Sequence, residues 1–258
     1  MSAPDPNKYS LFREKLHSTT PTLGAWITLS DPKIAEIFGT AGFDWVLVDL
    51  EHSSISETTA ELHIRMLAVS STLALCRPTT RSVDQMRRMM DAGADGFILP
   101  MTHGPEDIDH AVAATRFPPF GKRGMGLHAA NQYGHFFDTY YEQQHHHPIL
   151  IAQIEDSEGI DNLDTIAAHE ACDGIFMGPF DLSLSLGCPG AFDDPRFIEA
   201  VQNVEAIAQR HHKPLGIHVI DPTRQAVEDA IGKGYQFLSC SLDTKILLES
   251  ALAMSGKS

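Results

Sequence analysis

GFDWVLVDLEH, residues 42–52, is the stretch that decides the fold. Its centre, Trp45 to Asp49, is largely apolar on both faces, which is typical of a strand buried between a barrel interior and a layer of helices. Two further polar residues, Glu51 and His52, follow after Leu50. The stretch therefore predicts a buried parallel strand that delivers polar side chains at its carboxyl end.

Seven more runs of this kind alternate with helical patterns along the chain, which indicates βα units around a parallel sheet. Eight units in about 240 residues favour one closed (β/α)8 TIM barrel of the α/β class over an open, doubly wound sheet. An open sheet would normally carry a glycine-rich phosphate turn after its first strand, and neither GxGxxG nor GxxxxGK[ST] occurs there. We expect a single domain over residues 1–258. The predicted strands are Thr22 to Thr28, Trp45 to Asp49, Leu73 to Arg77, Gly96 to Pro100, Ile149 to Ile154, Gly174 to Gly178, Pro214 to His218 and Phe237 to Cys240.

Helical patterns fill the gaps between these runs, and several carry start and stop signals. Ser82, Asp31-Pro32 and Asp221-Pro222 are typical of helix starts. Gly42, Gly93 and Gly234 follow helices at positions that favour a left-handed residue. The predicted helices include Asp31 to Thr40, Ser82 to Ala92, Pro105 to Ala114, Ser157 to Ala168, Pro195 to His211 and Pro222 to Lys233.

The segment from Arg116 to Pro148 is too long to be a plain connection in a compact domain. We interpret its glycine-rich part, residues 121–126, as a loop at the mouth of the barrel, and the whole segment as a lid, an oligomer contact, or both. Three consecutive histidines, residues 145–147, cannot all face one ion, so a solvated loop is favoured over a transition-metal site.

Composition excludes several classes of protein. The 34 acidic and 19 basic residues give a formal net charge of −15, which would repel nucleic-acid phosphates and anionic lipids. The four cysteines are far apart with no CxxC pair, and the N-terminal residues contain no apolar signal-peptide core. These features predict a cytoplasmic protein with no nucleic-acid or membrane partner. A small anionic substrate would need local cations or a metal to overcome the negative field.

Polar residues at strand ends are candidates for a site, because reacting groups in such barrels lie at the carboxyl ends of strands. Glu155 and Asp181 follow adjacent strands and offer hard oxygen ligands, which suits Mg²⁺ or Mn²⁺, with Co²⁺ as a further candidate. Either carboxylate alone is more often a cap or an ion-pair partner; the pair favours a metal. The other candidates at this rim are Trp26, Asp49, Glu51, His52, Arg77 and Gln153.

Arg77 precedes Pro78 at the end of its strand, where its guanidinium would grip a carboxylate in a bidentate manner. A structural ion pair with Asp49 or Glu51 is the alternative. His52 is suited to proton transfer near neutral pH, although a lone histidine is as often structural. No lysine falls at the rim end of a strand, so a Schiff-base mechanism is disfavoured.

Four separated motifs resemble the HpcH/HpaI aldolase family: GFDWVLVDLEH at 42–52, Arg77-Pro78, Gln153-Ile154-Glu155 and GPFDLS at 178–183. The similarity runs from about Leu23 to Ala253. This family also includes 2-dehydro-3-deoxyglucarate and 2-keto-3-deoxyrhamnonate aldolases, and macrophomate synthase. The resemblance implies a barrel of the phosphoenolpyruvate/pyruvate-domain type that forms a homo-oligomer, a trimer or hexamer. The apolar stretch Ile246-Leu247-Leu248, with Leu252, could then pack on a neighbouring subunit.

The resemblance also implies a role for each candidate residue. A divalent metal would sit on Glu155 and Asp181 and chelate the keto and carboxylate oxygens of pyruvate. Arg77 would stabilise the pyruvate enolate, while His52, paired with Asp91, would move protons through a water. Gln153 would support the metal site, and Trp26, Asp49, Gly178 and Pro179 would complete the substrate pocket.

Three functions remain open on the sequence. The first is cleavage of a 4-hydroxy-2-oxo acid to pyruvate and an aldehyde, with the reverse addition. The second reaches the same enolate by decarboxylating oxaloacetate, as a macrophomate synthase-like enzyme would. The third is a non-catalytic barrel, whose signature would be loss of the carboxylates, His52 or Arg77, and none is lost. Phe180 stands where many bacterial relatives carry a small residue, so the aldehyde is not specified.

Overall fold

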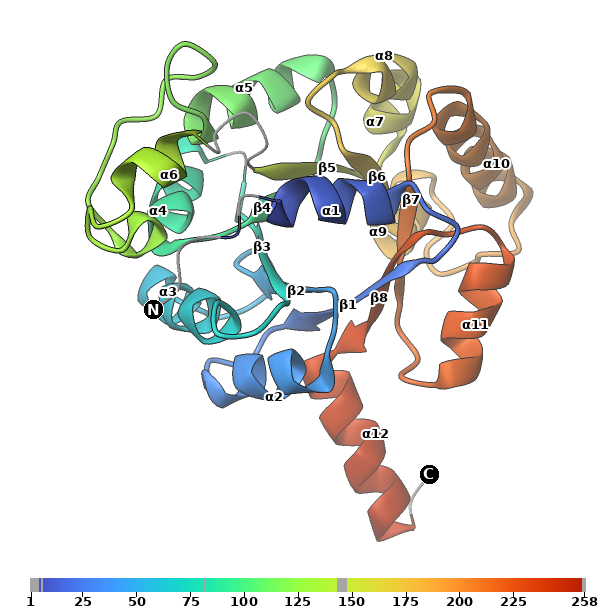
Figure 1. Cartoon of the computed structure of the whole chain (residues 1–258). Helices are drawn as coiled ribbons and strands as arrows, with labels where there is room; N and C mark the ends of the chain where they lie inside the picture. Colours follow the sequence, from blue (N-terminus) through green and yellow to red (C-terminus); the bar gives the residue numbers. More distant parts are fainter. Residues whose placement is uncertain (1–4, 6, 81, 143–147, 257–258) are drawn as a thin grey trace.

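The computed structural model of the chain describes residues 5, 7–80, 82–142 and 148–256. Eight parallel strands close into a barrel in sequence order, and β8 pairs with β1 (Figure 1). The (β/α)8 barrel is therefore confirmed, whereas its extent as one domain over the whole chain stays a prediction. The strands are β1 (Thr22–Ile27), β2 (Trp45–Asp49), β3 (Leu73–Arg77), β4 (Gly96–Leu99), β5 (Ile149–Ile154), β6 (Gly174–Met177), β7 (Leu215–Val219) and β8 (Phe237–Leu242).

Most predicted helices form with small changes at their ends. The predicted helix over 157–168 divides at Asn162 into α7 and α8. Ser82 caps α4 as predicted, because its side chain accepts from the Gln85 backbone N–H. The helices are α1 (Lys8–Leu16), α2 (Lys33–Ala41), α3 (Glu57–Leu67), α4 (Val83–Ala92), α5 (Pro105–Thr115), α6 (Phe137–Glu142), α7 (Ser157–Asp161), α8 (Leu163–Ala168), α9 (Pro179–Ser185), α10 (Pro195–Arg210), α11 (Arg224–Gly232) and α12 (Asp243–Ser255), with a 3₁₀ turn η1 (Ala129–Asn131).

Two predicted helix starts need correction. The helix α11 is capped by Thr223, whose side chain accepts from the Ala226 backbone N–H, and not by Asp221. The Asp31 side chain does accept from the Lys33 backbone N–H, but α2 begins at Lys33, after Pro32. By contrast, Gly42, Gly93 and Gly234 all have positive φ, as predicted.

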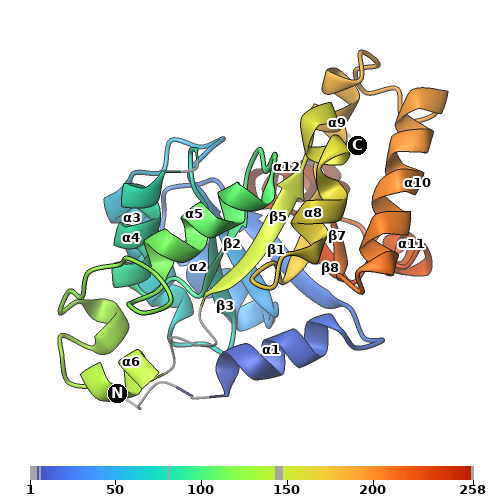
Figure 2. The same ribbon diagram turned by 90° about the horizontal axis from the view of Figure 1, so that it is seen from above.

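Large side chains fill the barrel interior. Trp45 stacks on Phe237 with ring centroids 4.2 Å apart, and a Cβ on Gly24 would lie only 2.1 Å from the Trp45 ring. The helix α1 covers the amino-terminal end of the barrel and adds Tyr9, Phe12 and Leu16 to this interior cluster. Figure 2 shows α1 at one end of the barrel and α9 at the other. One end is thus plugged, and the carboxyl ends of the strands form the open end.

Residues 116–142 and Pro148, the described part of the segment 116–148, do not lie at the mouth, so the interpretation of residues 121–126 as a loop there was wrong. The segment joins the end of α5 to the start of β5, and both lie at the amino-terminal end of the barrel. There Tyr140 of α6 is buried, and the Arg123 guanidinium donates to its hydroxyl at 2.9 Å. Figure 2 places α6 on the side of α1, away from α9. The described residues of the segment therefore do not form a lid over the carboxyl ends of these strands, and an oligomer contact stays a prediction. Residues 143–147, with the histidine run, lie outside the described residues.

The C-terminal helix α12 projects from the barrel (Figure 1). Its side chains Leu247, Leu248 and Met254 are 62%, 52% and 90% exposed. Within the described part of the chain, no helix combines the length and the apolarity needed to cross a membrane. All four cysteines are unpaired thiols. A cytoplasmic location stays a prediction.

Candidate active site

Strand alternation brings a set of polar side chains to the inner face at the open end. Alternate residues of each strand face the interior. The inward positions Trp45 and Leu47 of β2 are followed by Asp49, and Leu73 and Leu75 of β3 are followed by Arg77. The inward side chains at the carboxyl ends of their strands are Trp26 (β1), Asp49 (β2), Arg77 (β3), Gln153 (β5) and His218 (β7).

Two carboxylates and an indole ring hold the Arg77 guanidinium. Its Nε and Nη2 donate to the two oxygens of Asp49 at 3.0 and 2.8 Å, and Nε also lies 3.1 Å from Glu51 Oε2. The Trp26 ring lies 4.2 Å from the guanidinium carbon. Arg77 and Asp49 are both nearly fully buried. Arg77 therefore forms the structural ion pair and also faces the barrel interior, because Asp49 orients its guanidinium. Nη1 of Arg77 has no partner among the described residues.

Glu155 lies beside this pair and is itself held in place. Its Oε1 accepts from the Met101 backbone N–H at 2.6 Å, and its Oε2 accepts from Gln153 Nε2 at 2.5 Å. Gly178, at the end of β6, leaves room for it, because a Cβ there would lie 2.9 Å from Glu155 Cβ. The structure thus brings Gln153 to Glu155, and the predicted support of a metal site by Gln153 stays a prediction.

Three carboxylates face one another at this end of the barrel. Burial, with a smaller contribution from the negative charges of Glu51 and Asp181, raises the pKa of Glu155 to about 7, although the Met101 N–H and Arg77 act in the opposite direction. Burial also raises the pKa of Glu51, and Asp49 and Asp181 add to this effect. Asp181 is exposed, in the first turn of α9 after Pro179. Such an excess of negative charge on hard oxygen atoms fits a divalent cation.

A pocket of about 260 Å³ lies over these carboxylates. Among the described residues, no group of three or more histidine, cysteine or acidic side chains is arranged as a complete metal site. A cation held by Glu155 and Asp181 would therefore keep positions for water or substrate. The pocket is lined by Glu51, His52, Met101, Glu155, Asp156, Asp181 and Ser185.

The predicted pairing of His52 with Asp91 does not occur within the chain. His52 follows the carboxyl end of β2, and its exposed ring lies 3.8 Å from Glu51. Asp91 lies at the end of α4, just before β4 begins, and pairs with Arg123 Nη2 at 2.6 Å. Helices of a βα barrel run antiparallel to its strands, so these two residues lie at opposite ends of the barrel. Asp91 therefore lies outside the site in this chain.

Two contributors escaped the sequence analysis. His218 ends the predicted strand Pro214 to His218, so the rule that selected Arg77 would also have selected it. Met101 has a positive φ of 49°, and its backbone N–H holds Glu155. No sequence signal marks Met101, since a backbone donor is available to any residue other than proline.

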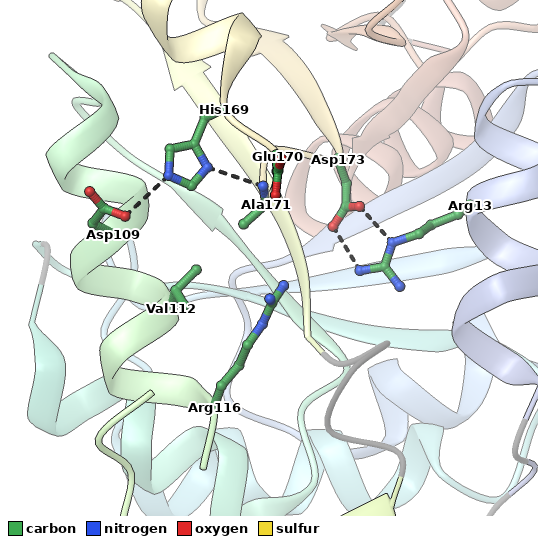
Figure 3. Close-up of a pocket in the computed structure, with 8 residues that line it drawn as sticks. All are labelled: Arg13, Asp109, Val112, Arg116, His169, Glu170, Ala171 and Asp173. Atoms are coloured by element: carbon green, nitrogen blue, oxygen red, sulfur yellow. Dashed lines mark hydrogen bonds and ion pairs between the residues drawn. The ribbon is translucent and has the colours of Figure 1, made fainter. Parts of the chain in front are cut away.

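A larger pocket, of about 360 Å³, lies at the opposite end of the barrel (Figure 3). There Arg13 Nε and Nη2 donate to Asp173 at 2.6 and 3.0 Å, and His169 Nε2 lies 3.2 Å from Asp109. Arg13 belongs to α1, which plugs the barrel, and Asp173 directly precedes β6. This pocket therefore lies at the amino ends of the strands, whereas the reacting groups of such barrels lie at the carboxyl ends. We do not assign the pocket to the active site.

Comparisons with known proteins agree with this geometry. The family model described as HpcH/HpaI aldolase/citrate lyase matches residues 22–250. The 5-keto-4-deoxy-D-glucarate aldolase of Klebsiella pneumoniae is 37% identical over 213 residues, which cover 82% of each chain. A crystal structure of an HpcH/HpaI aldolase/citrate lyase family protein from Burkholderia cenocepacia J2315 superposes with a TM-score of 0.89 at 28% identity, and covers 96% of this chain and 98% of that one. Macrophomate synthase shares the fold, with a TM-score of 0.79 at 21% identity over 97% of this chain and 88% of its own.

Proposed function

Because the chain belongs to the HpcH/HpaI aldolase/citrate lyase family, we propose that it is a class II aldolase of 4-hydroxy-2-oxo acids. Relatives named aldolases make it a carbon–carbon lyase of the aldehyde-lyase type. The reaction would release pyruvate and an aldehyde, and the reverse addition would join them. One observation carries this proposal: a buried arginine, fixed by Asp49 and Glu51, shares the barrel mouth with the carboxylates Glu155 and Asp181.

Glu155 and Asp181 would hold a divalent metal ion, Mg²⁺ or Mn²⁺. When bound, the metal would supply a fixed positive charge that polarises the keto group of the substrate. Gln153 and the Met101 N–H would hold Glu155 in its ligating position. Such supporting hydrogen bonds fix the orientation of a ligand before the metal arrives.

Arg77 would donate from its unpaired Nη1 to the oxygen on which negative charge develops. In cleavage the bond between C3 and C4 breaks, its electron pair remains on the pyruvate fragment as an enolate, and the C4 hydroxyl loses its proton. The enolate then takes a proton at C3 and becomes pyruvate. A donor fixed in advance contributes because it needs no reorganisation when the charge appears. Water at the exposed His52 ring would receive and return the protons.

The direct test is cleavage of a 4-hydroxy-2-oxo acid, with pyruvate measured as the product. We expect turnover with Mg²⁺ or Mn²⁺, loss of turnover with a chelator, and loss in both Glu155→Ala and Asp181→Ala. Metal-dependent release of CO₂ from oxaloacetate without aldol cleavage would favour the decarboxylase alternative. Turnover that persists in the chelator and in both variants would exclude the metal mechanism.

The exposed apolar side chains of α12 support a homo-oligomer. A helix that projects from the barrel with Leu247, Leu248 and Met254 in water would gain stability by covering them. A homo-oligomer built through α12 is therefore part of the proposed functional form, and the family resemblance implies that it is a trimer or hexamer.

A further inference from the structure

His218 is a polar residue at the barrel mouth that the proposed mechanism does not use. It lies on β7, two residues after Gly216. A Cβ on Gly216 would lie 2.7 Å from the Phe237 ring and 2.8 Å from the Phe176 ring, both of which fill the interior. Since alternate residues of a strand share a face, the His218 side chain points into the same interior.

The His218 ring belongs to the wall that also positions Arg77. It stacks on the Trp26 ring with centroids 4.7 Å apart and planes inclined by 29°. The Arg77 guanidinium carbon lies 4.2 Å from the same indole ring. His218 thus extends the wall of the site from β3 and β1 to β7, which pairs with β6 on its other side.

One ring nitrogen of His218 lacks a partner. Nε2 is buried and makes no hydrogen bond within the described parts of the chain. The backbone of Ser241 favours the protonated form of the ring, as a carbonyl oxygen near a ring N–H does. Because Nε2 has no partner, we assign the proton of the neutral ring to Nδ1. In the neutral ring Nε2 then carries only a lone pair, and a buried acceptor of this kind normally finds a donor.

His218 is uncharged at neutral pH. Burial lowers its pKa to about 4, and the nearby positive charge of Arg77 acts in the same direction. A neutral ring that presents a lone pair repels a carboxylate oxygen and accepts from a hydroxyl group. The ligand group that this position fits is therefore an O–H donor.

We propose that Nε2 of His218 accepts a hydrogen bond from a hydroxyl group of the acceptor aldehyde, so that the enzyme favours hydroxyaldehydes over alkyl aldehydes of the same size. This inference rests on the proposed aldolase function and specifies its second substrate. The pyruvate half of the substrate lies between Arg77 on β3 and the carboxylates that follow β5 and β6. The wall formed by Trp26 and His218 is left to face the acceptor.

The test compares glycolaldehyde with propionaldehyde, which differ by a hydroxyl in place of a methyl group, in addition to pyruvate. The quantity measured is the ratio of the two kcat/KM values. Because both values come from one preparation, the ratio is independent of the fraction of protein that folds. The variants are His218→Leu, which removes the acceptor, His218→Gln, whose amide oxygen restores one, and His211→Leu as a control on the outer helices.

We expect the ratio to fall about tenfold or more in His218→Leu, as for loss of a buried hydrogen bond of about 1.4 kcal/mol. His218→Gln should recover part of the preference, and His211→Leu should match the wild type. A wild-type ratio that is unchanged in His218→Leu, with both aldehydes turned over, overturns this inference alone. Absence of addition to either aldehyde by the wild type, with or without metal, overturns the proposed function and this inference with it.

Discussion

Glu155 is buried between two other carboxylates, which couples its protonation to folding. Its pKa rises from an ordinary value of 4.5 to about 7, chiefly because burial disfavours the charged form. The folded, metal-free protein therefore retains a proton between pH 4.5 and 7 that the unfolded chain loses. Where the folded state binds more protons, stability falls as pH rises. The shift corresponds to about 3 kcal/mol, lost progressively from pH 4.5 to 7.

This predicts that chelator-treated protein loses unfolding free energy between pH 5 and pH 8, and that Mn²⁺ restores it at pH 8. Urea denaturation at the two pH values measures the effect, and Glu155→Gln is the control because an amide does not titrate. A loss of equal size in Glu155→Gln would show that other groups cause it. Metal affinity should also rise with pH over this range, because the ligand must release its proton.

Arg77 offers a second prediction at this scale. Arg77→Lys keeps the positive charge beside the buried Asp49 but cannot pair with both of its oxygens. We expect kcat/KM for aldol cleavage to fall about a hundredfold or more, because a fixed donor to the enolate is lost. Calorimetric titration with Mn²⁺ should give an affinity close to that of the wild type. A parallel loss of metal affinity would mean that Arg77 organises the carboxylates and does not act on the enolate.

The junction between β6 and α9 shows how one element sets the position of another. Gly178 lies where a Cβ would approach Glu155 Cβ to 2.9 Å and Gln153 Nε2 to 3.3 Å. We predict that Gly178→Ala folds but binds Mn²⁺ about tenfold more weakly, because loss of ligand support typically costs this much or more. Gly232→Ala is the matched control, since a Cβ there meets nothing within 4 Å. Equal metal affinity in both variants would contradict the account.

The strands were predictable because each is a short buried run, and β2, β3 and β5 begin and end where the sequence places them. Glu155, Arg77 and Asp49 follow from the same strands. The end of the barrel at which a loop lies was harder to predict. Residues 121–126 were interpreted as a loop at the mouth, although they follow the end of α5, which lies at the opposite end of the barrel. The helix α1 was overlooked, yet its buried Tyr9, Phe12 and Leu16 recur at helical spacing.

At the scale of the whole molecule, the two ends of the barrel have different tasks. The mouth collects Arg77, Glu155 and His218, and the other end is closed by α1. This division separates His52 from Asp91, which local motifs could not reveal because both residues lie in segments that match the family. Contacts between residues far apart in sequence depend on the direction of every intervening element.

The exposed side chains of α12 give a prediction about assembly. Light scattering coupled to size exclusion should show the wild type as a trimer or hexamer. Replacing Leu247 and Leu248 together by Glu should reduce the mass, because charged residues disfavour a buried apolar contact. Val69→Glu changes another exposed apolar residue, 83% exposed on the barrel, and should leave the mass unaltered. A monomeric wild type would contradict an oligomer built through this helix.

The central claim is that the mouth of the barrel forms a pyruvate enolate with the help of a metal. Proton exchange at the pyruvate methyl group in deuterium oxide, followed by NMR, tests this claim without knowledge of the aldehyde. The account predicts exchange with Mg²⁺ or Mn²⁺, none above background with a chelator, and none in Glu155→Ala. Exchange that is equally fast with the chelator, or absent with every divalent metal, would contradict it.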